Sequence, residues 1–227
     1  MLYRVQKLLS NYGYCSRRNA EELIKEGRVK VNDRVISIGD KASYEDKIYV
    51  DGKLVEKEKK VYLIFNKPAG CVTALKDERF KTVMDYIKVK ERVFPVGRLD
   101  YNTSGLLILT NDGDFANRVM HPRYEIKKTY FVKTDKAIKE RDLKGLEKGV
   151  ELEDGVTSPA KVHKVSSNSA EIIIHEGKKR IVRRMFEKIG YKVAYLERIK
   201  IGGLELGSLK PGRYKFLSEK EIKKVFS

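Results

Sequence analysis

The sequence predicts an α+β protein in which a small segment of helices and hairpins precedes a larger segment dominated by strands. Three observations lead to this prediction. Apolar residues near the N-terminus recur at helical spacing and are followed by short alternating stretches. Beyond residue 60, strand patterns outnumber helical ones, which favours a mostly antiparallel mixed sheet with flanking helices. A charged stretch at 57–60 has no apolar anchor, so we expect domains at 1–58 and 59–227.

The small segment is predicted to fold as two helices and a hairpin. Helical spacing is shared by four apolar residues, Val5, Leu8, Leu9 and Tyr12. Ser16 is a suitable N-cap for a second helix, which Gly27 ends. Alternation at 29–31 and turn residues at 32–33 then predict a hairpin, and a second turn is expected at 51–52.

Basic side chains gather where the second helix begins and on the strand after it: Arg17, Arg18, Arg28 and Lys30. A helix start beside a basic strand suits phosphate binding, although a charged face that only meets solvent has the same composition. The run from Ser16-Arg17-Arg18 through Gly27-Arg28-Val29 to Val31-Asn32 resembles the αL RNA-binding domain first known from small-subunit ribosomal protein four. The resemblance implies RNA binding by this segment.

The larger segment alternates strand and helix signals. We expect strands at 61–65, 106–110, 127–134 and 170–175, and a last strand pair around 202–203. We expect helices at 82–87, at 179–189, in a short segment ending at Met120, and after Ser218, where Glu221 completes a capping box.

Charge and composition narrow the functional classes. The 227 residues carry 49 Lys and Arg against 32 Asp and Glu, a net charge of +17, which indicates a polyanionic partner such as nucleic acid. No apolar run approaches the roughly 20 residues of a membrane span, and no secretory signal is visible, so we expect a cytoplasmic protein. Cys15 and Cys71 lack paired spacing, the three histidines are scattered, and no glycine-rich phosphate loop is present. We therefore expect neither metal nor cofactor.

Asp100 is the most interesting carboxylate of the chain. It lies in a turn-rich stretch directly before the apolar run at 106–109, where a rigid strand would hold the loop. Taken alone, an aspartate in such a loop more often hydrogen-bonds its own turn.

The surrounding motif adds a resemblance. Gly97-Arg98-Leu99-Asp100, followed by Thr103-Ser104-Gly105, resembles the active-site motif of pseudouridine synthases, in particular the RsuA family of bacterial rRNA enzymes. Four further stretches match that family in the same order: Asn66-Lys67-Pro68, Lys128-Thr129-Tyr130, the run from Glu176 to Phe186, and the ending from Glu197 to Tyr214. Ile181 departs from the family, which often has a polar residue there.

The resemblance implies roles for individual residues. Asp100 would be the catalytic nucleophile, Tyr130 the tyrosine that stacks on the base, and Arg183 the bidentate partner that keeps Asp100 ionised. Substrate or RNA contacts would come from Arg98, Lys67, Leu196, Arg180 and Arg184. From the residue pattern alone, Tyr130 and Leu196 could equally be core, and the three helical arginines a solvated basic face.

The function expected from this resemblance is isomerisation of one uridine, flipped out of its helix, in rRNA. The ending from Glu197 to Tyr214 favours 16S rRNA of the small subunit, free or in an assembling particle, as the substrate of a monomeric enzyme. A 23S rRNA enzyme of the same family and a non-catalytic RNA-binding assembly factor stay open as alternatives. Whether Asp100 attacks the anomeric carbon or removes a sugar proton also stays open.

Overall fold

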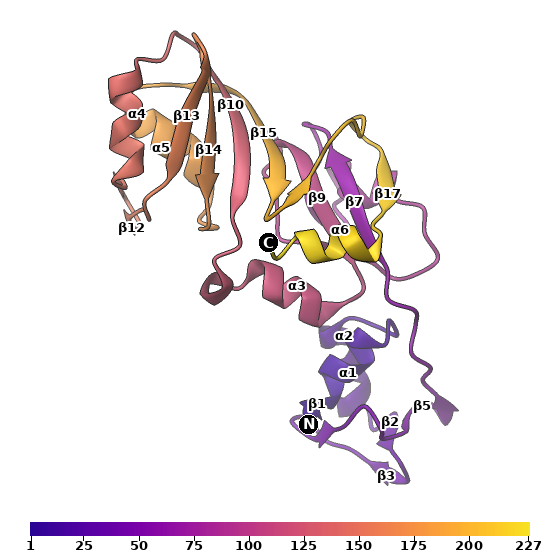
Figure 1. Ribbon diagram of the computed structural model, residues 1–227. Coiled ribbons are helices and arrows are strands. Elements are labelled where there is room, and N and C mark those ends of the chain that lie inside the picture. Colours follow the sequence, from indigo (N-terminus) through magenta and orange to yellow (C-terminus); the bar gives the residue numbers. More distant parts are fainter. The chain divides into compact units, whose positions relative to one another are not determined.

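The computed structural model describes residues 1–227 and divides them into two units (Figure 1). The first contains Met1–Val61 together with the short segments Val89–Phe94 and Thr110–Phe115. The second contains Tyr62–Lys88, Pro95–Leu109 and Ala116–Ser227. The domain limits 1–58 and 59–227 stay a prediction. No helix of the protein is both long enough and apolar enough to cross a lipid bilayer.

The first unit packs two helices on a small sheet. Helix α1 (Val5–Asn11) and helix α2 (Arg17–Lys25) precede a four-stranded sheet in the order β3-β2-β5-β6. Its strands are β2 (Val29–Val31), β3 (Arg34–Val35), β5 (Ile48–Val50) and β6 (Lys53–Leu54). A separate pair joins β1 (Tyr3–Arg4) to β4 (Lys41–Ala42).

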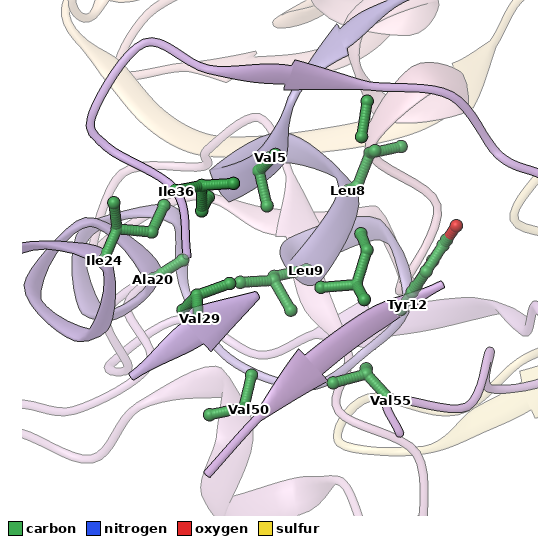
Figure 2. Packing of buried hydrophobic residues seen from close by; sticks show 12 residues of the cluster. Val5, Leu8, Leu9, Tyr12, Ala20, Ile24, Val29, Ile36, Val50 and Val55 are labelled. Atoms are coloured by element: carbon green, nitrogen blue, oxygen red, sulfur yellow. The ribbon is translucent and has the colours of Figure 1, made fainter. Parts of the chain in front are cut away.

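The apolar face predicted for the first helix is buried in the core of this unit. Figure 2 shows Val5, Leu8 and Leu9 of α1 facing Ala20 and Ile24 of α2 and the inward residues of the sheet. Ser16 caps α2 by accepting a hydrogen bond from the Asn19 amide, which confirms the predicted start of that helix. The core therefore holds the start of α2, with its exposed arginines, against the sheet.

A nine-stranded mixed sheet organises the second unit. Seven strands form the path β13-β14-β10-β15-β9-β7-β17, with β16 beside β15 and β8 beside β9. The central strands are β7 (Tyr62–Lys67), β9 (Ser104–Thr110), β10 (Lys128–Thr134) and β15 (Val193–Ile201). The remaining strands are β8 (Phe94–Val96), β13 (Lys161–Ser166), β14 (Ser169–Ile174), β16 (Leu204–Glu205) and β17 (Tyr214–Phe216). Strands β9 and β15 pair in parallel, whereas β10 pairs antiparallel with both β14 and β15, and this mixed sheet confirms the predicted fold class.

Helices flank this sheet. They are α3 (Gly113–Met120), α4 (Glu140–Glu147), α5 (Ile181–Lys188) and α6 (Glu219–Lys224). Helix α4 packs against β13, as Figure 1 shows, and α5 packs against β15. The helix predicted at 82–87 is a 3-10 helix, η1 (Val83–Tyr86), and a second, η2 (Pro122–Tyr124), follows α3. The sequence analysis did not find α4 or the hairpin of β11 (Glu151–Leu152) and β12 (Gly155–Val156).

Candidate active site

The loop between β8 and β9 presents Asp100 to solvent. Leu99 is buried, and its backbone exchanges hydrogen bonds with the Thr73 hydroxyl at 2.8 and 3.2 Å. On the other side, the Thr103 amide donates to the Asp100 carbonyl at 3.0 Å and closes a turn. The Asp100 carboxylate itself makes no hydrogen bond or ion pair. The loop is therefore fixed on both sides of an exposed carboxylate, a common arrangement at catalytic sites.

Lys67 supports this loop from inside the protein, where its side chain is not accessible to RNA phosphate. Its side chain at the end of β7 is fully buried, which corrects the sequence-based expectation. The ammonium donates to four carbonyl oxygens: Pro68 at 3.0 Å, Asp100 at 3.2 Å, Tyr101 at 3.4 Å and Thr103 at 2.9 Å. Burial lowers the pKa of Lys67, while the nearby charges of Cys71 and Asp100 act in the opposite direction.

The Arg183 side chain on α5 binds the backbone of the same loop. The guanidinium donates to the carbonyl of Asn102 at 2.8 Å and to that of Val193 at 2.9 Å, and so ties the loop to the start of β15. The expected bidentate pair with Asp100 is not formed in this structure. The two residues are nevertheless electrostatic neighbours, since burial lowers the pKa of Arg183 and the Asp100 charge raises it.

Tyr130 and Leu196 lie on neighbouring strands behind the loop. Tyr130 on β10 is paired with Arg198 of β15, and Val132 on the same strand is paired with Leu196. Because alternate residues of a strand share a face, Tyr130 and Leu196 lie on one face of the sheet. Both are buried. Their roles as stacking residue and apolar wall stay predictions.

The other arginines expected to contact substrate have different surroundings. Arg98 is exposed and has no partner in the structure, so it is available to RNA. Arg180 is also exposed, with a long ion pair to Glu187 at 3.5 Å. The Arg184 guanidinium is bound bidentately by Asp154 at 2.7 and 3.0 Å, and it connects α5 to the hairpin of β11 and β12. Arg184 thus has a protein partner in this structure, and its expected RNA contact stays a prediction.

The basic cluster of the first unit is also divided. Arg17 and Arg18 at the start of α2, and Lys30 on β2, are exposed and unpaired. Arg28 is engaged by Asp51 at 2.7 and 2.8 Å and by Glu26 at 2.9 Å, and these contacts raise its pKa further. Three of the four predicted residues therefore remain free to meet phosphate.

Sequence reasoning assigned no role to two cations beside Tyr130. Lys128 and Arg198 occur in motifs quoted above, but the half-buried position of Lys128 and the burial of Arg198 were not foreseen. The signal that could have found them is a charged residue on the inward phase of an apolar strand. The structure brings together no group of three or more His, Cys, Asp or Glu side chains able to hold a metal ion.

Comparison with known proteins identifies the family. The family model described as RNA pseudouridylate synthase matches residues 61–188, and the S4 domain model matches residues 4–43. The chain belongs to the RNA pseudouridylate synthase family. It is 46% identical to ribosomal large subunit pseudouridine synthase B of Bacillus subtilis (strain 168) over 231 residues, covering 98% of this chain and 95% of the relative.

Two further comparisons agree with this assignment. The chain is 35% identical to the dual-specificity RNA pseudouridine synthase RluF of Escherichia coli (strain K12), with 98% of this chain and 78% of that protein covered. A crystal structure of a pseudouridylate synthase superposes with a TM-score of 0.74 at 32% identity, covering 98% and 99% of the two chains. The protein is therefore a pseudouridine synthase, an isomerase with an N-terminal S4 domain.

The salt dependence of RNA affinity should distinguish the unpaired cations of the S4 domain from Arg28, which is held in ion pairs. Replacing Arg17 and Arg18 together by glutamine is expected to reduce the slope of log affinity against log salt by about 1.4–1.8, because each lost phosphate contact contributes about 0.7–0.9. Arg28→Gln is expected to change the slope much less, since Asp51 and Glu26 already hold that guanidinium. Filter binding of an rRNA fragment at several salt concentrations measures both slopes. A larger effect from Arg28→Gln than from the double variant would contradict this division.

Proposed function

We propose that this pseudouridine synthase isomerises one uridine in the 23S rRNA of the large ribosomal subunit. The observation that carries the proposal is the 46% identity to a large-subunit synthase across nearly the whole of both chains. The 16S target expected from the ending at 197–214 is not confirmed, and the relatives favour the 23S alternative. The S4 domain, with Arg17, Arg18 and Lys30 exposed, supports a structured RNA substrate.

Asp100 is the proposed nucleophile of this reaction. The glycosidic bond between C1′ and N1 of the uridine breaks, the uracil turns, and a bond forms between C1′ and C5. The proton on C5 is lost and N1 gains one, so atoms balance and nothing is oxidised. An exposed carboxylate on a fixed loop suits attack on the sugar, and Arg183 holds that loop through Asn102.

Reaching the uridine requires that it leave its helix. A stacked base cannot present its C5 and N1 atoms to a protein side chain, so the nucleotide must be flipped. Exposed Arg98, two residues before Asp100, is proposed to occupy the space that the base leaves. Tyr130 and Leu196 are proposed to hold the uracil while it turns, since an aromatic face and an apolar wall confine a base without binding it covalently. A monomer acting in the cytoplasm is part of this proposal.

Pseudouridine mapping tests the target directly. Unmodified 16S and 23S transcripts, free and partly assembled with ribosomal proteins, are incubated with the wild type and with Asp100→Asn. We expect one new pseudouridine in 23S rRNA that is absent with the variant. A single site in 16S rRNA would replace the proposed substrate and keep the enzyme. A site that persists with Asp100→Asn would remove Asp100 from the mechanism.

A further inference from the structure

Two cations lie beside Tyr130 on the inward face of the sheet, and neither has a carboxylate partner. Lys128 stands two residues before Tyr130 on β10, so both side chains leave the same face. Arg198 is directly paired with Tyr130 across β10 and β15. No ion pair is formed by either cation. Burying an unpaired charge costs free energy in a folded protein. Such charges beside Tyr130, the residue proposed to stack on the uracil, therefore indicate a functional role.

Arg198 is the more deeply buried of the two. Its side chain is 3% exposed, and Nε donates to the Leu106 carbonyl at 2.8 Å, whereas the buried Nη2 has no hydrogen-bond partner. Gly105 lies opposite Arg198 on β9 with a φ of +103°, and any Cβ there would collide with the Arg198 backbone. The glycine thus lets β9 and β15 approach closely at the level of Tyr130.

Lys128 is held by two backbone carbonyls. Its ammonium donates to Ile126 at 2.9 Å and to His175 at 3.2 Å. Burial, together with the charge of Arg198, lowers the pKa of Lys128 to about 8. The loop between β14 and α5 also brings His175 and Glu176, but the Glu176 carboxylate is engaged by the Ser158 amide and by Lys178. No carboxylate therefore offsets the charge of Lys128.

We infer that Lys128 and Arg198 form a built-in positive field that stabilises the negative charge appearing on the uracil when its glycosidic bond breaks. The electron pair of the C1′–N1 bond moves to the ring as the base departs, so the detached uracil is an anion until C5 bonds to C1′. The C5 proton is then lost and N1 takes up a proton, which leaves the base neutral. Fixed charges in a site that excludes water stabilise such an anion without reorganising. The two cations exchange no proton and form no bond in this step.

This inference rests on the proposed stacking of uracil on Tyr130. It predicts opposite pH dependences for activity and stability. Activity needs the Lys128 ammonium, so kcat/KM should fall as the pH rises through about 8, the pKa in the free enzyme. In the unfolded chain the pKa of a lysine is near 10.5, so the unfolded state binds more protons between about pH 8 and 10.5 and folding stability gains from Lys128 as the pH rises.

The experiment compares Lys128→Met with Lys127→Met, which removes the same charge from the exposed neighbouring position. Values of kcat/KM for the rRNA fragment are measured from pH 6.5 to 9.5, together with RNA affinity and thermal stability. We expect Lys128→Met to lower the rate about 10- to 100-fold at pH 7 and to abolish the fall near pH 8, with RNA affinity equal to that of Lys127→Met. Lys128→Arg should restore much of the rate and keep it above pH 8.

Other results would overturn the inference. Equal rates and equal pH profiles for Lys128→Met and Lys127→Met would show that the field does not act on the reaction. If Lys128→Met loses rate but keeps the fall near pH 8, another group titrates and Lys128 is only structural. Inactivity of the wild type on every RNA tested would instead count against the proposed function, so the two failures are distinguishable.

Discussion

Replacing Asp100 by asparagine is expected to lower the rate of uridine isomerisation at least about 10⁴-fold, the scale seen when a catalytic nucleophile is removed. The amide is isosteric with the carboxylate but cannot act as a nucleophile or base at neutral pH. Folding should be unaffected, since Lys67 and the Thr103 amide bind only the backbone carbonyl of Asp100. RNA affinity should stay within about twofold, because one exposed charge among many changes the total little.

Asp33→Asn is the matched control for this variant, since Asp33 is also exposed in a turn and its carboxylate has no partner. Single-turnover conversion of an rRNA fragment, with binding measured in parallel, separates chemistry from affinity. Retention of more than a few per cent of the rate by Asp100→Asn would show that the carboxylate is not the reacting group. A parallel loss of RNA binding would point instead to a role in substrate contact.

Much of the local structure could be predicted because it depends on neighbouring residues. The apolar stripe of α1 and the Ser16 cap of α2 were predicted correctly, as was the capping box in which Ser218 and Glu221 start α6. Helix α4 was missed because only Leu143 and Leu146 are buried on it, too few to make a clear stripe. Within the motif around Asp100, the position of this residue on an exposed loop agrees with its turn-rich sequence.

The partners of the charged residues could not be predicted because they come from distant segments. Arg184 meets Asp154 thirty residues earlier, and Arg28 meets Asp51 in the turn between β5 and β6. When charges are counted from the sequence, every such arginine is counted as positive charge that is free to bind a partner. Only the folded structure shows which arginines already form ion pairs within the protein. Arg183 is a related case, since the carbonyls that bind it belong to backbone, which carries no signature in the sequence.

Lys67 is the residue for which sequence expectation and structure differ most, and its replacement should have the second large effect. A lysine is normally exposed, yet here the ammonium is buried among carbonyls from two segments of the chain. Lys67→Met removes the cost of burying the charge, but it leaves the carbonyls of Pro68 and Thr103 without this donor. Since an unsatisfied buried carbonyl costs about 1–3 kcal/mol, we expect a net loss of about 2–4 kcal/mol in stability.

The same variant should also lower activity, because the loop that presents Asp100 loses its central support. A displacement of about 1 Å at a reacting group can cost about 100-fold in rate, and we expect a loss of this order in kcat. RNA affinity should change little, since the buried ammonium does not contact RNA. Differential scanning calorimetry and single-turnover kinetics measure the two effects, with exposed Lys76→Met as the control for lost charge.

Comparing the loss of stability with the loss of kcat shows whether Lys67 acts only on the fold or also positions the Asp100 loop. If Lys67 only stabilises the fold, activity measured well below the melting temperature should remain close to that of the wild type. If it positions the Asp100 loop, kcat should fall at temperatures where the variant is fully folded. Since Lys67 donates to three carbonyls within residues 100–103, directly at the proposed nucleophile, we expect the second result. Unchanged kcat in a folded Lys67→Met protein would mean that the Thr73 and Thr103 contacts alone are sufficient to hold the loop.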